Sequence, residues 1–295
     1  MADRNLFVMS VDVDSWSSLL RFYSVEHDPV EANSQVEIDY GISKLLYLFR
    51  KHKVRATFFV PGEVAKIGRQ AIKSAIEEGH ELACHGLAHD KNECLLPFSD
   101  QFARIKEASE ALRREIGDAP RGFRAPCLRA NGETIRVLKR LGYVYDSSVL
   151  PSYVPGYYGY LTGIPRPYQP SFSSLREMGT SGILELPVSV NPFLGIPFSA
   201  AWMRNLGVSW VKTSIKMNFN MNRPVVFYIH PRDVSHLPKV KGLPWHVYRN
   251  AGERAFRMLD EIMEYVKRHG KFVSGLDLAE KSSVLLEAQN DARLQ

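Results

Sequence analysis

The stretch LFVMSVDVD, residues 6–14, decides the fold. It is a short run of strand-forming apolar residues that ends in two aspartates. Similar runs recur along the chain, and segments with the 3.6-residue periodicity of helices separate most of them. The predicted strands cover residues 6–13, 56–62, 80–86, 122–126, 143–149, 183–190, 224–231 and 271–275. The predicted helices cover residues 37–52, 63–80, 99–117, 131–142, 200–217 and 250–270.

This alternation predicts an α/β fold in which helices cover a parallel sheet. Seven or eight such units in 295 residues favour a closed or distorted TIM-like (β/α) barrel over an open doubly wound sheet. No GxGxxG motif follows the first strand, which argues against a dinucleotide-binding fold. We therefore expect a single domain over residues 1–295, with an irregular insertion rich in Pro, Gly and Tyr at about 151–182.

The composition is that of a soluble globular protein, with 45% apolar and 24% charged residues. The net charge of +6 comes from 38 basic and 32 acidic residues of mixed sign, which argues against a nucleic-acid partner. Three cysteines without a CxxC pair predict no disulfide framework. No signal peptide and no apolar stretch long enough for a membrane span are apparent, so a cytoplasmic location is the default expectation.

Ionisable residues follow the apolar part of five predicted strands. In a parallel barrel the carboxyl ends of the strands open on one face, where catalytic groups lie. Six such residues at five strand ends therefore indicate an enzyme rather than a binding module. They are Asp12, Asp14, His85, Arg124, Asp146 and His230.

The spacing within two pairs of residues suggests a metal site. Asp12 and Asp14 are two apart on a strand, so their carboxylates project to the same side and repel unless a cation or an arginine compensates them. His85 and His89 are four apart, so a helical turn over HGLAH would place both rings on one face. Two imidazoles and one carboxylate suit a divalent metal, while Arg124 can neutralise the second aspartate.

Five short motifs, in their order along the chain, resemble those of the polysaccharide deacetylase (NodB-homology) family, carbohydrate esterase family 4. The first motif is similar to that of the branch with DxD in place of adjacent aspartates. The resemblance implies a distorted (β/α)7 barrel and metal-dependent hydrolysis of an N-acetyl group on an amino sugar or N-acetylated glycan. The motifs are SVDVD (10–14), HGLAH (85–89), RAP (124–126), YDSS (145–148) and YIHP (228–231).

The resemblance also implies roles for residues of the metal site. Asp14, His85 and His89 would bind the cation, with Zn²⁺ expected first and Co²⁺, Ni²⁺ or Mn²⁺ as alternatives. Asp12 would be the general base that activates water, and Arg124 would orient it. The extra residue between the two aspartates leaves open which of them is the base and which the ligand.

Further roles concern the leaving group and the substrate. His230 would be the general acid that protonates the amine, with Asp146 supporting its charge. A backbone N–H near Cys127 would stabilise the oxyanion, and the Cys127 side chain would shape the pocket wall. Independently of the resemblance, the tyrosine content of the insertion suggests that Tyr153 and Tyr157 bind the sugar by stacking, although they can equally attach the loop to the barrel.

Two other functions use the same barrel. One is an allantoinase-like or cyclic-imidase-like amidohydrolase, and the complete set of metal ligands argues against it. The other is an inactive barrel that binds glycans, and the intact acid and base argue against that. The sequence names no particular substrate, metal or oligomeric state.

Overall fold

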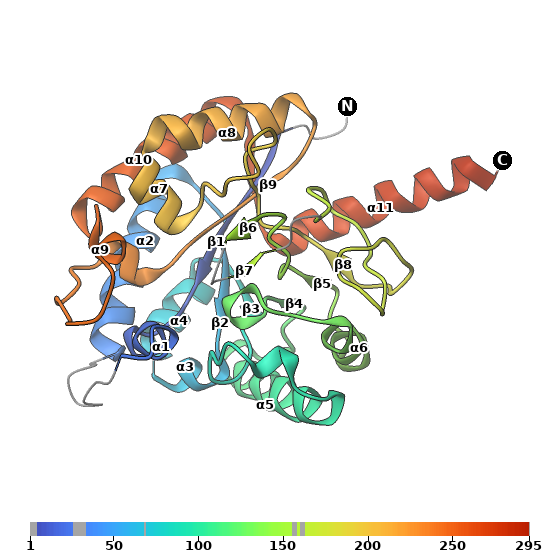
Figure 1. Ribbon diagram of the computed structural model, residues 1–295, viewed down its shortest axis with the longest axis horizontal. Helices are drawn as coiled ribbons and strands as arrows, with labels where there is room; N and C mark the ends of the chain where they lie inside the picture. The colour runs from blue at the N-terminus through green and yellow to red at the C-terminus, as the bar shows by residue number, and fades with distance from the viewer. Residues whose placement is uncertain (1–4, 26–33, 68, 155–157, 160–162, 295) are drawn as a thin grey trace.

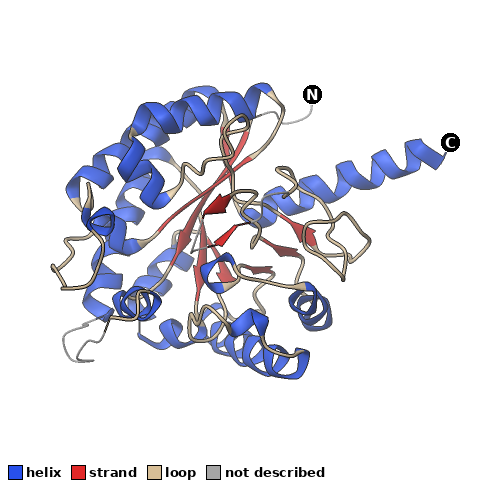
Figure 2. Cartoon of the chain, viewed as in Figure 1, coloured by secondary structure: helices blue, strands red, loops and turns tan. Residues whose placement is uncertain are grey.

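The computed structural model describes residues 5–25, 34–67, 69–154, 158–159 and 163–294. Its main sheet is parallel and curled, and helices surround it on most sides (Figures 1 and 2). This arrangement confirms the predicted distorted barrel. The strands of the main sheet are β1 (Leu6–Asp12), β2 (Thr57–Val60), β3 (Glu81–Cys84), β4 (Gly122–Phe123), β5 (Tyr145–Asp146), β8 (Leu184–Glu185), β9 (Val225–Ile229) and β10 (Lys271–Val273).

The remaining elements connect and cover these strands. The α-helices are α1 (Trp16–Phe22), α2 (Ser34–His52), α3 (Gly62–Ile67), α4 (Arg69–Glu77), α5 (Phe98–Ile116), α6 (Gly132–Leu141), α7 (Ala200–Leu206), α8 (Val208–Asn220), α9 (Trp245–Tyr248), α10 (Glu253–His269) and α11 (Gly275–Leu294). Three short 3-10 helices are η1 (Glu93–Leu95), η2 (Pro126–Leu128) and η3 (Pro231–Val234). A separate hairpin pairs β6 (Tyr153–Val154) with β7 (Tyr158–Gly159).

Strand β1 is the centre of the sheet and is buried along its whole length. One edge pairs with β9 over residues 7–11. The other edge is shared, because β10 pairs with residues 6–8 and β2 with residues 10–12. The eight strands therefore fill seven positions around the barrel, in the order β9, β1, β2 with β10, β3, β4, β5 and β8. The segment after β8 meets β9 through two hydrogen bonds, one from Ser189 N–H to Val226 O at 3.0 Å and one from Val226 N–H to Ser189 Oγ at 2.9 Å.

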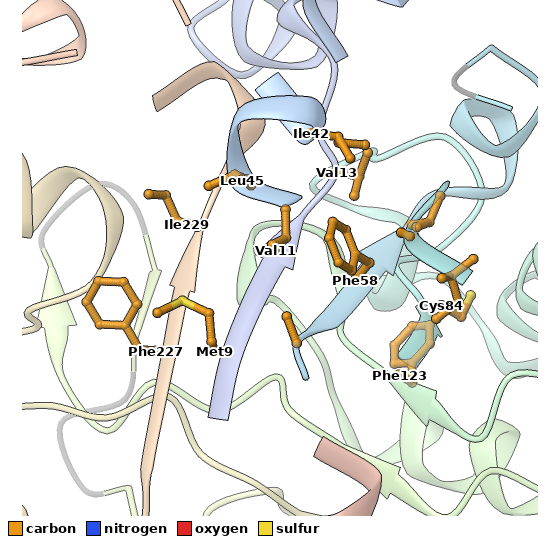
Figure 3. Close-up of a cluster of buried hydrophobic side chains, with 14 of the residues drawn as sticks. Met9, Val11, Val13, Ile42, Leu45, Phe58, Cys84, Phe123, Phe227 and Ile229 are labelled. Carbon is orange, nitrogen blue, oxygen red and sulfur yellow. The ribbon is translucent and has the colours of Figure 1, made fainter. Parts of the chain in front are cut away.

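Side chains alternate between two apolar layers along each strand. Val8, Phe59 and Tyr145 belong to a cluster inside the barrel, to which the start of α11 contributes Leu278. Val11 faces outward, toward Leu45 of α2, in the larger cluster between the sheet and the helices (Figure 3). Because Asp12 and Asp14 continue the inward series, their carboxylates lie at the carboxyl end of the barrel interior.

Some elements differ from the sequence prediction. The predicted helix over 200–217 is two helices, because Gly207 between them has φ of 92°. Helices α1 and α9 were not predicted, and both are short pieces beside the carboxyl end of the barrel. Helix α11 extends away from the body of the protein (Figure 1). Among the described helices, none combines the length and the apolar character needed to cross a bilayer.

Candidate active site

The carboxyl ends of β1, β3 and β9 open into a cavity of about 440 Å³. The loops after these strands carry most of its polar groups, while α1, α7 and α9 supply an apolar wall. Five of the six predicted strand-end residues meet here, since Arg124 lies directly behind Asp12. The polar residues that line the cavity include Asp12, Asp14, His85, His89, His230, Arg232 and Asp233.

Asp12 is paired with Arg124. Arg124 is fully buried, and its Nη1 donates to Asp12 Oδ1 at 2.6 Å and to Ser10 Oγ at 2.9 Å. Its Nε and Nη2 donate to the backbone oxygen and the hydroxyl of Ser147, at 3.0 and 2.9 Å. The guanidinium also stacks 4.0 Å from the centre of the Phe59 ring. A guanidinium held on all sides in this way orients the Asp12 carboxylate rigidly.

Asp14 lies between two imidazoles. Its Oδ1 is 3.3 Å from Nε2 of His85 and 3.1 Å from Nε2 of His89. Burial alone would raise the pKa of Asp14. The charge of His89, the nearby imidazoles and the charge of Arg232 instead hold this pKa well below its ordinary value. The carboxylate is therefore ionised near neutral pH. Asp14, rather than Asp12, is the aspartate beside the two histidines.

The two histidines do not lie on a helical turn. HGLAH is a loop in which Gly86 and His89 have φ of 71° and 51°. The buried carboxylate of Glu93 holds this loop, because it accepts the N–H groups of Leu87 at 2.6 Å and Ala88 at 3.2 Å. The ring centres of the histidines still lie 5.0 Å apart. The predicted convergence is present, but the helical reason given for it was wrong.

A cation fits this group of ligands. One ligand atom each from Asp14, His85 and His89 lie within 4.8 Å of one another. Nδ1 of His85 is 2.7 Å from the backbone oxygen of Arg124, which fixes the proton on that nitrogen and leaves Nε2 as an acceptor facing Asp14. Asp14 Oδ1 is buried and accepts no hydrogen bond. An orphaned carboxylate oxygen opposite an imidazole lone pair is stabilised by a positive ion between them.

His230 follows β9 and contacts Asp233 three residues later. Nδ1 of His230 is 3.0 Å from Asp233 Oδ2, which also accepts the backbone N–H of His230 at 2.9 Å. Arg204 Nε lies 2.8 Å from Asp233 Oδ1. Burial would raise the pKa of Asp233, but Arg204 and His230 hold it far below its ordinary value. A permanently ionised carboxylate thus orients the His230 ring, whose Nε2 faces the cavity 3.4 Å from Asp14 Oδ2.

Asp146 is therefore not the partner of His230, contrary to the sequence expectation. Tyr145 points into the barrel, so the next side chain on β5 points outward. There Asp146 lies in register with Glu185 of β8 and accepts the Ser148 hydroxyl at 2.5 Å. Burial raises the pKa of Asp146 to about 6 and that of Glu185 further above its ordinary value. Asp146 belongs to a buried carboxyl pair behind the barrel wall.

The cavity wall contains one of the three residues expected to bind substrate. Cys127 lines the cavity in a strained conformation with φ of 55°, and burial raises the pKa of its thiol to about 12. Tyr157 and the side chain of Tyr153 lie outside the described residues. The apolar wall, which sequence reasoning missed, includes Leu19, Phe22, Trp202, Leu237, Trp245 and Val247.

Sequence reasoning also missed the charged residues around His230. Arg232 Nη1 is 3.1 Å from Asp14 Oδ2. Behind it, Glu37 of α2 accepts the Trp16 N–H at 3.1 Å, and burial raises the pKa of Glu37 to about 7. The signal for Asp233 was its spacing, because an acid three residues after a strand-end residue can cap the following turn. No local pattern marked Glu37, which comes from a distant helix.

Comparison with known proteins shows which family the first half of the chain resembles. The model of the polysaccharide deacetylase family matches residues 39–145, and a domain of unknown function (DUF3473) matches residues 147–274. Both regions contribute strands to the one sheet. Assignment to a DxD branch stays a prediction.

Individual relatives agree with this match. A peptidoglycan deacetylase of Helicobacter pylori is 28% identical over 159 residues, which are 54% of each chain. A chitin deacetylase of Colletotrichum lindemuthianum is 34% identical over 106 residues, 34% of this chain and 42% of the relative. The chain thus spans about half the length of the curated relatives it matches.

Solved structures share the fold. The crystal structure of a polysaccharide deacetylase from Mycobacterium smegmatis, itself assigned only provisionally, superposes with a TM-score of 0.66 at 23% identity, covering 97% of this chain and 91% of that one. At this identity the likeness supports the barrel and not a particular substrate. Residues 39–145 of the chain carry a domain that matches the polysaccharide deacetylase family.

Proposed function

We propose that the protein is a metal-dependent hydrolase that removes N-acetyl groups from an amino sugar or an N-acetylated glycan. One observation carries the proposal: Asp14 Oδ1 lies unpartnered between Nε2 of His85 and Nε2 of His89, in the cavity that also holds Asp12 and His230. A ligand group, a base and an acid in one cavity are what amide hydrolysis requires. The names of the curated relatives support this class of reaction.

Asp14, His85 and His89 would hold the cation, for which Zn²⁺ is the first expectation. When bound, it would supply Lewis acidity that polarises the amide carbonyl and acidifies water. Asp12 is placed to take the proton of the attacking water, because Arg124 fixes one of its oxygens and leaves the other toward the cavity. Arg124 itself stays behind the carboxylate and does not reach the substrate.

His230 completes the reaction. Its Nε2 faces the cavity while Asp233 holds Nδ1, so the ring can deliver a proton from Nε2 to the departing nitrogen. Without that proton the amine is a poor leaving group. The apolar wall beside these residues suits the methyl of an acetyl group and the CH face of a sugar. Cys127 contributes to this wall as a neutral thiol. Stacking by Tyr153 and Tyr157 stays a proposal from the sequence.

An acetate-release assay tests the proposal. The substrates are N-acetylated sugars, chito-oligosaccharides and peptidoglycan fragments, with allantoin added for the cyclic-amide alternative. We expect acetate release that a chelator abolishes and added Zn²⁺ or Co²⁺ restores. Activity on allantoin alone, or release that is insensitive to the chelator, would contradict the proposal.

Two groups of variants separate the roles. Asp14→Asn and His85→Ala should lose metal and activity together. Asp12→Asn and His230→Ala should keep about one metal per chain but lose turnover by a factor of about 10² to 10⁴. Metal content measured by elemental analysis then shows whether each residue binds the metal or acts only in catalysis. Full metal retention in the first pair would refute the ligand assignment, and full activity in the second pair would refute the acid and base.

A further inference from the structure

Arg232 is a buried charge of the site to which the proposed reaction assigns no role. It belongs to η3, directly after His230 and Pro231, and its side chain is 11% exposed. Its Nη1 donates to Asp14 Oδ2 at 3.1 Å. An arginine on a metal-binding carboxylate competes with the cation for the same negative charge. The position of Arg232 therefore bears directly on how a cation is held.

The backbone that carries Arg232 is fixed against α2. A Cβ added to Gly41 of α2 would lie 2.5 Å from the backbone oxygen of Pro231, so the helix and the turn pack closely enough to leave no room for a side chain there. The same helix supplies Glu37, which accepts the Trp16 N–H at the start of α1, two residues after Asp14. Arg232 and Asp14 are thus attached to one rigid support. Their contact is set by the fold rather than by a flexible surface side chain.

The two carboxylate oxygens of Asp14 have different neighbours. Oδ1 faces the Nε2 atoms of His85 and His89 and accepts no hydrogen bond. Oδ2 is occupied by Arg232, with His230 Nε2 at 3.4 Å on the same oxygen. A carboxylate can offer a cation one oxygen or two, and here the second is already engaged. The geometry leaves Oδ1 as the single oxygen for the cation.

The charge around Arg232 is only partly compensated. Asp14, Asp233 and Glu37 are the carboxylates that stabilise its positive charge. Asp233 is already paired with Arg204, and Glu37 uses one oxygen for a backbone N–H while the other has no hydrogen-bond partner. Asp14 is therefore the direct counter-charge of Arg232. Sharing that charge leaves less of it for a bound cation.

We propose that Arg232 is a positioning residue that restricts Asp14 to one metal-binding oxygen and weakens the retention of the cation. The inference rests on the proposed metal site and goes beyond it, because it assigns a residue that sets affinity rather than one that binds metal or moves a proton. A cation held by fewer negative charges keeps more of its own positive charge for the substrate carbonyl.

The test is a Zn²⁺ titration of the metal-free, full-length protein in competition with a chromophoric chelator at pH 8. Arg232→Met removes the charge at similar volume, and Arg232→Lys keeps the charge. We expect R232M to bind Zn²⁺ roughly tenfold more tightly than the wild type, and R232K to stay within about threefold of it. The absorption spectrum of bound Co²⁺ should change in R232M, because Oδ2 is freed as a second ligand, and should return toward the wild type in R232K.

Glu37→Gln supplies a second variant away from the ligands. At pH 8, above the pKa of about 7 that burial gives Glu37, the substitution removes a negative charge that compensates Arg232. We therefore expect E37Q to weaken Zn²⁺ binding about threefold, in the opposite direction to R232M. This variant keeps the inference testable if R232M does not fold, as judged by circular dichroism.

The outcomes separate the two proposals. A wild-type protein that binds no Zn²⁺ overturns the metal site itself. Wild-type binding with unchanged or weaker affinity in a folded R232M overturns the role of Arg232 alone, since a merely structural contact would orient Asp14 and its loss would lower affinity. Unchanged or tighter Zn²⁺ binding in E37Q would likewise overturn the role of Arg232 alone.

Discussion

The buried pair of Asp146 and Glu185 leads to a prediction about stability and pH. Burial raises the pKa of Asp146 from 3.8 to about 6 in the folded protein, while the unfolded chain keeps the ordinary value. The folded state therefore binds this proton more tightly than the unfolded state. The stability that comes from binding this proton to Asp146 is fully present below about pH 4 and is lost as the pH rises through about 6. The difference of about two pKa units corresponds to about 3 kcal/mol.

Asp146→Asn removes this dependence. The amide can still accept the Ser148 hydroxyl, so at pH 4.5 we expect the free energy of unfolding to stay within about 1 kcal/mol of the wild type. Between pH 4.5 and 8 the wild type should lose stability that the variant keeps. At pH 8 the variant should be more stable by up to about 3 kcal/mol. Urea denaturation followed by tryptophan fluorescence at four or five pH values measures the difference.

Glu185→Gln is the matched variant. It removes the other member of the pair, whose pKa is also raised by burial and by the charge of Asp146, so its effect should have the same sign. Acetate release by Asp146→Asn at pH 7 should stay close to the wild type, because Asp146 does not contact His230. Stability curves that run parallel for the variant and the wild type, together with lost activity, would refute this reasoning and return Asp146 to a catalytic role.

Three further predictions concern the site and its support. Asp233→Asn should lower kcat at least tenfold with little change in KM, because His230 loses the carboxylate that orients it; steady-state kinetics at saturating metal check this. Gly41→Ala should destabilise the protein by about 1–3 kcal/mol in urea, since the methyl would overlap the Pro231 carbonyl; an unchanged midpoint would contradict that contact. Native protein should resist alkylation of Cys127 by iodoacetamide at pH 7.5 because its thiol is protonated, and rapid labelling in a mass spectrum would show otherwise.

Local sequence patterns were sufficient for the barrel and for most of the site. Apolar runs that end in polar residues predict buried parallel strands, and the inward series from Val8 to Asp14 follows from the two-residue period of a strand. The same rule could not place Asp146 of β5 from the sequence, and only the structure shows that Tyr145 fills the barrel interior and Asp146 therefore points outward. Apolar residues flank Asp146 at too few positions for the sequence alone to decide its face.

Residues that act from other elements could not be predicted in this way. Glu93, Arg204 and Glu37 each contact the site from a helix or turn whose distance from it depends on packing. In the loop HGLAH the positive φ angles of Gly86 and His89 bring the two histidines together. A helical spacing rule does not describe this conformation.

The sequence by itself predicted the order of the main strands and most of the helices, and it selected the residues that we propose as the acid, the base and the metal ligands. Only the tertiary structure decided which aspartate lies beside the histidines, which carboxylate supports His230 and which arginine occupies the second oxygen of Asp14. The physical reason is that strand and helix periods act over a few residues of one segment. Charge pairing instead depends on distances of about 3 Å between segments far apart in the chain, and those distances exist only after the helices have packed on the sheet.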